Sequence, residues 1–228
     1  MKPSELEEWI GRFNKKLGES IRFSYPVRDT TLQRNAAASL EEFVCELDAQ
    51  RLACRENDDC DPANLFLSLR AYSSAVVAVL RMWLAIRADN PDQAWEFLID
   101  AQDGGRAALR AHQYFAADID NFLRYLTSVE YIVFPKQQFV SISFEVRSSG
   151  CSLCNAPYHE CDHIAGFAYN GEFCAEVIHE VSALDHIAIV DAPFDKRCRT
   201  TSLTKGGLKL DAFTFRSVPV ENVTGTQL

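Results

Sequence analysis

Apolar side chains recur at helical spacing from about residue 30 to residue 128. Residues three and four apart lie on one side of a helix, so such a stripe predicts an amphipathic helix. The first stripe consists of Leu40, Phe43, Val44 and Leu47. A longer stripe from Leu69 to Trp83 follows Asp61-Pro62, where an acidic cap and a first-turn proline favour a helix start.

Two shorter helical patterns come next. One begins after Asn90-Pro91 and carries Trp95 and Leu98, and Gly104-Gly105 is expected to end or interrupt it. The other carries Phe115, Ile119, Phe122 and Leu126 on one face. The segments between these patterns are short, which predicts helices that pack antiparallel as a bundle.

The hydrophobic period changes near Val129. Tyr131–Phe134 and Phe139–Val146 resemble strands, and the second alternates apolar side chains on one side. Further strand-like runs are residues 175–181, 186–190 and 209–215. We therefore predict an α+β fold. A helical bundle would occupy residues 1–129, and a small zinc-supported α+β domain would occupy residues 130–228.

Composition and chain start are typical of a soluble intracellular protein. The chain of 228 residues is 47% hydrophobic and 24% charged, and no apolar run approaches the ~18 residues that span a bilayer. The N-terminus carries acidic residues and lacks the basic and apolar regions of a signal peptide. A cytoplasmic location without membrane contact follows, and there the eight cysteines would be free thiols or metal ligands.

A group of cysteines with a histidine provides the strongest chemical signal. Cys151 and Cys154 form a CxxC pair, and Cys161-x-His163 offers a second pair of donors. Thiolate and imidazole donors at this spacing can surround Zn²⁺ tetrahedrally, and four protein ligands make a structural site rather than a catalytic one. We prefer this set of four, with Cys174 as the alternative fourth ligand after turn residues that could bring the chain back.

Other interpretations of these cysteines are weaker. A lone CxxC pair could be redox-active or simply buried, but the added CxH pair favours zinc. Histidine ligation of iron–sulfur clusters is restricted, and soft thiolates disfavour Mg²⁺ and Ca²⁺. Cys161 beside His159 or His163 could be a nucleophile with its base, yet metal binding explains these residues better, so no catalytic residue is predicted.

The same stretch resembles a zinc knuckle of poorly characterised bacterial and phage-associated proteins. These proteins share a CSxC…CxHxxGxxYxG…C pattern, which Cys151–Cys174 matches here, with a Val-Pro-type segment downstream at Ile189–Pro193. The resemblance covers about 50 residues and leaves the helical half unexplained. It implies the metal ligands but no activity.

Three functional hypotheses follow. The leading one is a non-enzymatic zinc-binding protein whose metal organises an interaction domain, with a protein partner or a second copy bound by the helical half, for example at the acidic segment 41–61. The second is nucleic-acid binding through a basic C-terminal segment, although the net charge of −9 opposes general coating of nucleic acid. Its residues are Lys196, Arg197, Arg199, Lys205 and Lys209. The third is a hydrolase whose site forms only in the fold. The neighbours His179-Glu180 and Asp185-His186 place acids beside imidazoles but are weak signals of acid–base chemistry, because adjacent residues usually face different directions.

Overall fold

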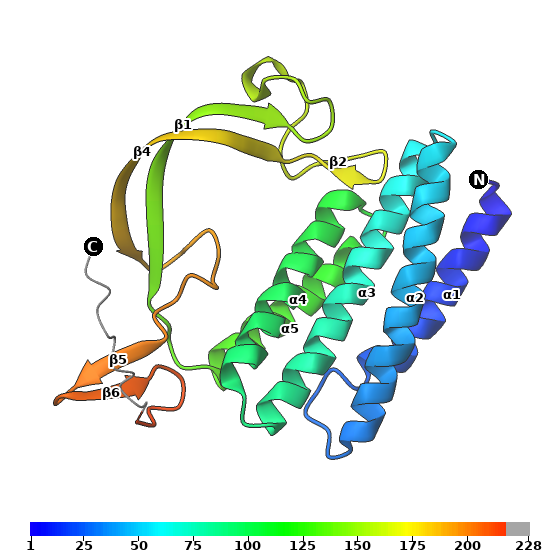
Figure 1. Cartoon of the computed structure of the whole chain (residues 1–228). Coiled ribbons are helices and arrows are strands. Elements are labelled where there is room, and N and C mark those ends of the chain that lie inside the picture. The colour runs from blue at the N-terminus through cyan, green and yellow to red at the C-terminus, as the bar shows by residue number, and fades with distance from the viewer. Residues whose placement is uncertain (218–228) are drawn as a thin grey trace.

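Residues 1–217, which the computed structural model describes, form a helical bundle followed by strands, so the predicted α+β class is confirmed. The helices stand side by side and α3 packs between α2 and α4 (Figure 1). They are α1 (Pro3–Ile21), α2 (Thr30–Glu56), α3 (Cys60–Arg87), α4 (Pro91–Ala111) and α5 (Ala116–Val133). Helix α1 precedes residue 30, where the predicted helical pattern begins, so the pattern did not predict it.

Helix α3 forms the centre of the hydrophobic core. Its Phe66, Val76, Leu80 and Met82 are fully buried. By length and composition this helix alone among the described residues could cross a membrane, with a mean hydropathy of 1.5 over its most apolar window. However, 78% of that window is buried inside the protein. Its apolar character is therefore explained by neighbouring helices on several sides.

The helix starts follow local capping chemistry. The Asp29 carboxylate accepts a hydrogen bond of 2.8 Å from the backbone N–H of Thr31 at the start of α2. The side-chain oxygen of Asn90 accepts a hydrogen bond from the backbone N–H of Gln93 at the start of α4, as expected for an Asn-Pro start. Helix α3 begins two residues earlier than its sequence suggested, because Asp59 rather than Asp61 holds the N-cap position.

Gly104 and Gly105 do not end α4, which continues to Ala111, so that expectation was wrong. A Cβ atom on Gly104 would lie 3.0 Å from the Cβ of Ala75, and one on Gly105 would lie 2.7 Å from a methyl carbon of Leu123. The two glycines therefore permit close packing of α4 against α3 and α5. That contact compensates for their low helix propensity.

The strand expected at Tyr131–Phe134 is also wrong, because residues 131–133 form the last turn of α5. Buried Leu126 and Val129 continue the helical stripe, and the packing of that stripe outweighs the strand propensity of the residues that follow. Tyr131 and Ile132 point outward, with 89% and 79% of their surface exposed. The division into residues 1–129 and 130–228 stays a prediction.

A long antiparallel ribbon follows the helices. Strand β1 (Phe139–Cys151) pairs with β4 (Glu176–Val190), and β4 is continuous where the sequence indicated two shorter runs. Two small hairpins, β2 (Ala168–Tyr169) with β3 (Glu172–Phe173) and β5 (Ser202–Lys205) with β6 (Leu208–Asp211), complete the described strands. The last run predicted as a strand is shorter than expected, since residues 212–214 form a turn.

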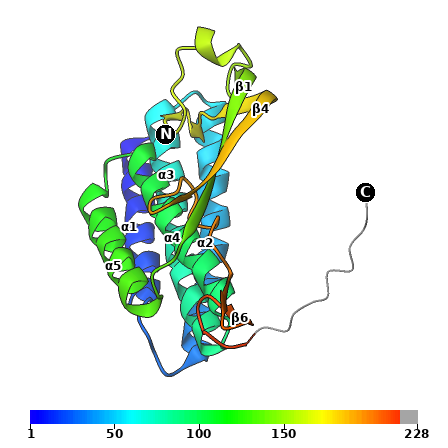
Figure 2. The same ribbon diagram turned by 90° about the vertical axis from the view of Figure 1, so that its left-hand side faces the viewer.

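The ribbon arches away from the bundle and is attached to it at both ends (Figure 1). At its base, Phe139 stacks on Trp95 of α4, whose indole N–H donates a 3.0 Å hydrogen bond to the carbonyl of Lys196. At its tip, the connection between β1 and β4 contacts α2 and α3. Figure 2 shows from the side that the two strands run together beside the bundle.

Candidate metal centre

The candidate metal site closes the tip of the ribbon. Strand β1 ends at Cys151, whose carbonyl accepts a hydrogen bond of 3.0 Å from the N–H of Asn155. Asn155 adopts a left-handed conformation with φ of 60°, which turns the chain directly after Cys154. A short 3-10 helix, Tyr158–Glu160, then delivers Cys161.

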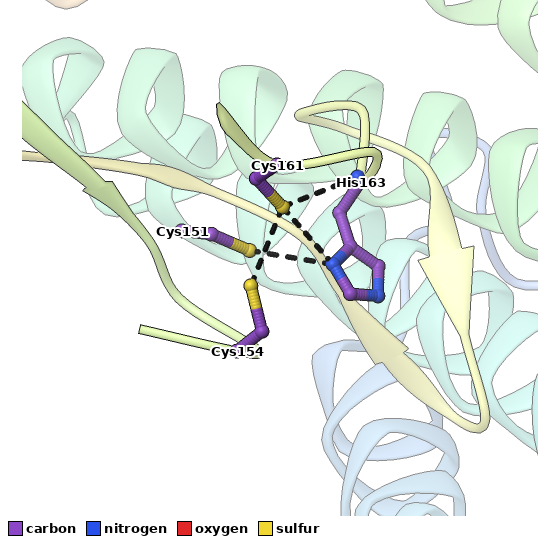
Figure 3. Close-up of side chains that lie close together, drawn as sticks. All are labelled: Cys151, Cys154, Cys161 and His163. Atoms are coloured by element: carbon purple, nitrogen blue, oxygen red, sulfur yellow. Dashed lines mark hydrogen bonds between the residues drawn. The ribbon is translucent and has the colours of Figure 1, made fainter. Parts of the chain in front are cut away.

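The four predicted donors converge from these segments. One ligand atom from each of Cys151, Cys154, Cys161 and His163 lies within 4.8 Å of the other three (Figure 3). The Sγ atoms of Cys154 and Cys161 are 3.3 Å apart, and Cys161 Sγ is 3.2 Å from His163 Nδ1. Donors on a tetrahedral metal with ~2.3 Å metal–sulfur bonds are separated by roughly 3.8 Å. The cluster can therefore hold a metal ion after small adjustments.

The structure also fixes how His163 faces the cluster. Its Nδ1 atom points toward the sulfurs of Cys161 and Cys151, at 3.2 Å and 3.7 Å (Figure 3). The Tyr169 ring lies edge-on to the imidazole with centroids 4.7 Å apart, and its hydroxyl accepts a hydrogen bond from the N–H of Ile164. Packing on Tyr169 thus holds Nδ1, rather than Nε2, toward the sulfurs.

Backbone amides aim at the sulfurs, as expected for a knuckle. The N–H groups of Cys154 and, to a lesser extent, Leu153 lower the pKa of the Cys151 thiol to about 6, against the effect of desolvation. The N–H of His163 favours the Cys161 thiolate, but desolvation and the neighbouring thiols outweigh it and raise the pKa of Cys161 to about 11. A negative charge on one sulfur therefore disfavours ionisation of the neighbouring thiols. A bound cation would neutralise the charges of all the thiolates together.

Cys174 returns to the edge of the cluster. Gly166, Asn170 and Gly171 all have positive φ angles, and the last two form the tight turn between β2 and β3. Cys174 Sγ comes within 3.7 Å of Cys151 Sγ and is buried, and desolvation raises the pKa of its thiol. It lies outside the set of four mutually close donors.

The β2–β3 turn beside the candidate metal site docks on the helical bundle through Gly171. Its carbonyl accepts a hydrogen bond of 2.8 Å from the Arg51 guanidinium, and its N–H donates to the Asn64 side chain at 2.8 Å. A Cβ atom here would lie 3.2 Å from both Arg51 Cγ and Ala63 Cβ, so glycine permits the close approach. Arg110 also donates to the Gly166 carbonyl at 3.0 Å. These contacts join residues more than fifty positions apart, and no local pattern marks them.

Three of the five basic residues proposed for nucleic acid are engaged by carboxylates. Lys196 Nζ lies 2.6 Å from Glu130 Oε2, and Arg199 pairs with Asp92 and is 4% exposed. Arg197 contacts Glu96, Asp100, Asp103 and Asp195. Lys205 and Lys209 lie exposed on the β5–β6 hairpin. Much of the basic segment thus neutralises carboxylates on α4 and α5. The nucleic-acid hypothesis stays a prediction, with less free positive charge to support it.

Several carboxylates of the acidic segment 41–61 are likewise paired. Glu41 contacts Arg81, Glu46 contacts Arg12, and Asp48 lies 2.9 Å from Arg51 and 3.0 Å from Arg70. These pairs join α2 to α1 and α3. The segment is therefore less negative as a surface than its sequence suggests.

The acid–imidazole neighbours His179-Glu180 and Asp185-His186 lie on β4. His186 Nδ1 is 2.9 Å from Asp185 Oδ2, and both side chains are 61% exposed. His179 and Glu180 are exposed as well. Exposed pairs lack the enclosure that an acid–base site requires, which does not favour that hypothesis.

We found no match to this chain among protein-family models, curated proteins or solved structures. The resemblance to the zinc knuckle therefore stays a prediction.

Proposed function

We propose that this chain is a cytoplasmic zinc-binding protein whose metal has a structural role. The observation that carries the proposal is the convergence of three thiols and one imidazole nitrogen at the tip of the β1–β4 ribbon. Sulfur-rich sites with tetrahedral spacing favour Zn²⁺ over Mg²⁺ or Ca²⁺. Four protein donors complete the coordination sphere and leave no position for a reactive water.

The metal would fix the connection between two long strands. Cys151 is the last residue of β1, and β4 begins at Glu176. An isolated two-stranded ribbon is marginally stable, and its long connection adds a loop-closure cost. Zinc bound across that connection would hold the tip in one shape and present Gly171 correctly to Arg51 and Asn64.

In this proposal the fixed ribbon is an interaction module. Side chains of both β1 and β4 are exposed between the two attached ends of the ribbon, so the surface of the ribbon is available to a partner. All eight cysteines are free, and none forms a disulfide within residues 1–217, which suits a reducing compartment. These observations support a cytoplasmic binding role.

Metal analysis of purified full-length protein tests the proposal. Protein expressed with zinc available is expected to contain about one equivalent, and Cys154→Ser should reduce this below about half, because one of four ligands is removed. Cys45→Ser is the matched control, since Cys45 is exposed on α2 outside the cluster. Wild-type protein with less than half an equivalent of zinc would contradict the proposal.

A further inference from the structure

One face of the β1–β4 ribbon is apolar from Val140 to Val146 of β1 and over the residues of β4 that pair with them, although the register shifts between Ser143 and Phe144 and between Glu145 and Val146. Residues directly opposite each other in an antiparallel pair project to the same side of the sheet. The register therefore aligns four apolar pairs, Val140–Ile189, Ile142–Ile187, Phe144–Leu184 and Val146–Val181. The opposite face carries Ser141, Ser143 and Glu145, and it begins with Phe139 packed on Trp95. The apolar face is consequently turned away from that contact.

Residues 1–217 leave this apolar face uncovered. Leu184, Ile187 and Ile189 are 76%, 71% and 76% exposed, and Ile142 is 55% exposed. Soluble proteins rarely expose contiguous apolar patches of more than a few hundred Å², and larger ones mark binding surfaces. Both strands contribute, and β4 contributes more, because Phe144 and Val146 of β1 are only 41% and 42% exposed.

The area and chemistry of the face suit a second copy of the same chain. The exposed fractions of its side chains correspond to on the order of 800 Å² of apolar surface, which matches the ~800 Å² that each partner contributes to a standard interface. None of the eight positions is charged, so the face offers no charge pattern that would select a charged partner. An aliphatic face of this kind is complementary to itself.

We propose that two copies stack these apolar faces across a two-fold axis and form a four-stranded β-sandwich. Each two-stranded ribbon then gains the second layer that a stable sheet requires. The same patch serves both subunits, as in other two-fold dimers. The inference rests on the proposed function, because the zinc-closed tip holds the ribbon in the shape that both copies must share.

Net charge gives this association a distinguishing salt dependence. Each copy carries a formal charge of −9, so two copies repel each other and added salt screens the repulsion. An apolar interface between such copies should strengthen or stay constant as salt rises. An interface held by opposite charges would weaken instead.

The oligomeric state of full-length, zinc-loaded protein tests the proposal. Sedimentation velocity between about 1 and 100 μM should yield twice the chain mass of 25.7 kDa, at low and at high salt. Leu184→Asp combined with Ile187→Asp should weaken association at least about a hundredfold, because each copy would bury two charges at the interface. Ile187→Thr keeps strand propensity and should weaken it about tenfold.

Ile132→Asp is the matched control, because Ile132 is an exposed aliphatic residue at the end of α5, outside the ribbon. It should leave the dimer unchanged, and all variants should keep their zinc content and circular dichroism. A zinc-loaded monomer at about 100 μM would overturn the proposal and show that another protein or residues 218–228 must cover the face. A dimer that persists in the variants at Leu184 and Ile187 would also overturn the proposal. A dimer without zinc would instead contradict the proposed function alone.

Discussion

The Arg51 guanidinium donates a hydrogen bond of 2.8 Å to the carbonyl of Gly171, although 120 residues separate them in the chain. The bond joins α2 to the turn of the small hairpin that follows the metal ligands. Arg51 is 13% exposed and is held by Asp48, so its side chain is already oriented for the contact. The bundle thereby anchors the tip of the ribbon.

Replacing Arg51 should loosen this anchor without removing the metal. We expect Arg51→Ala to lower the free energy of unfolding by about 2 kcal/mol, since a hydrogen bond from a charged group and the packing of its stem are both lost. Urea unfolding of the zinc-loaded protein measures this. Arg106→Ala, which removes an exposed ion pair within α4, should cost less than about 0.5 kcal/mol. Equal losses for the two variants would contradict the anchoring role.

The ligand set leads to a prediction about Cys174. We expect Cys174→Ser to retain about one equivalent of zinc, because within residues 1–217 the four mutually close donors are Cys151, Cys154, Cys161 and His163. His163→Ala should lose most of its zinc, as the imidazole supplies the fourth donor. The absorption of the cobalt-substituted protein provides a second measurement, since three thiolates and one nitrogen differ from four thiolates. Full zinc binding by His163→Ala would assign Cys174 as the ligand instead.

The buried part of the basic segment should matter for stability. The Arg199 guanidinium lies 3.8 Å from the Phe213 ring centroid and pairs with Asp92 while almost fully buried. We expect Arg199→Met to cost about 2 kcal/mol in urea unfolding, because a desolvated cation–π contact and an ion pair are both lost. The matched control is Arg216→Met, because Arg216 and its partner Asp89 are both exposed. This substitution should cost less than about 1 kcal/mol. A larger loss of stability in Arg216→Met than in Arg199→Met would contradict the stabilising role of Arg199.

Sequence reasoning succeeded where the chemistry is local and failed where it is not. The four metal donors fall within thirteen residues, so their spacing sufficed to predict the cluster. Likewise, the alternation from Val140 to Val146 predicted the strand and its apolar face. For Arg197 and Arg199, by contrast, nothing near them in sequence shows that acidic residues of α4 lie opposite, so their ion pairs could not be predicted. Gly104-Gly105 misled for the same reason, since their neighbours are on α3 and α5.

Tyr125 gives a prediction about alkaline pH. Its hydroxyl donates to the Ser24 carbonyl, which also accepts from the Trp83 indole at 2.7 Å. Desolvation raises the pKa of Tyr125 to about 12, with a smaller opposing effect of Trp83. Between pH ~10 and ~12 the unfolded chain loses this proton while the folded protein keeps it, so stability falls as pH rises through that window.

Tyr125→Phe should therefore be less stable than wild type by about 1 kcal/mol at neutral pH, because the hydrogen bond to Ser24 is lost. It should also lose stability less steeply between pH ~10 and ~12, because no phenol titrates at this position. Urea midpoints measured over a pH series test both effects, and the remaining titrating groups cancel in the difference. Tyr131→Phe is the control, since Tyr131 is 89% exposed and should leave the pH profile unchanged. Parallel profiles for wild type and Tyr125→Phe would show that burial does not favour the protonated phenol.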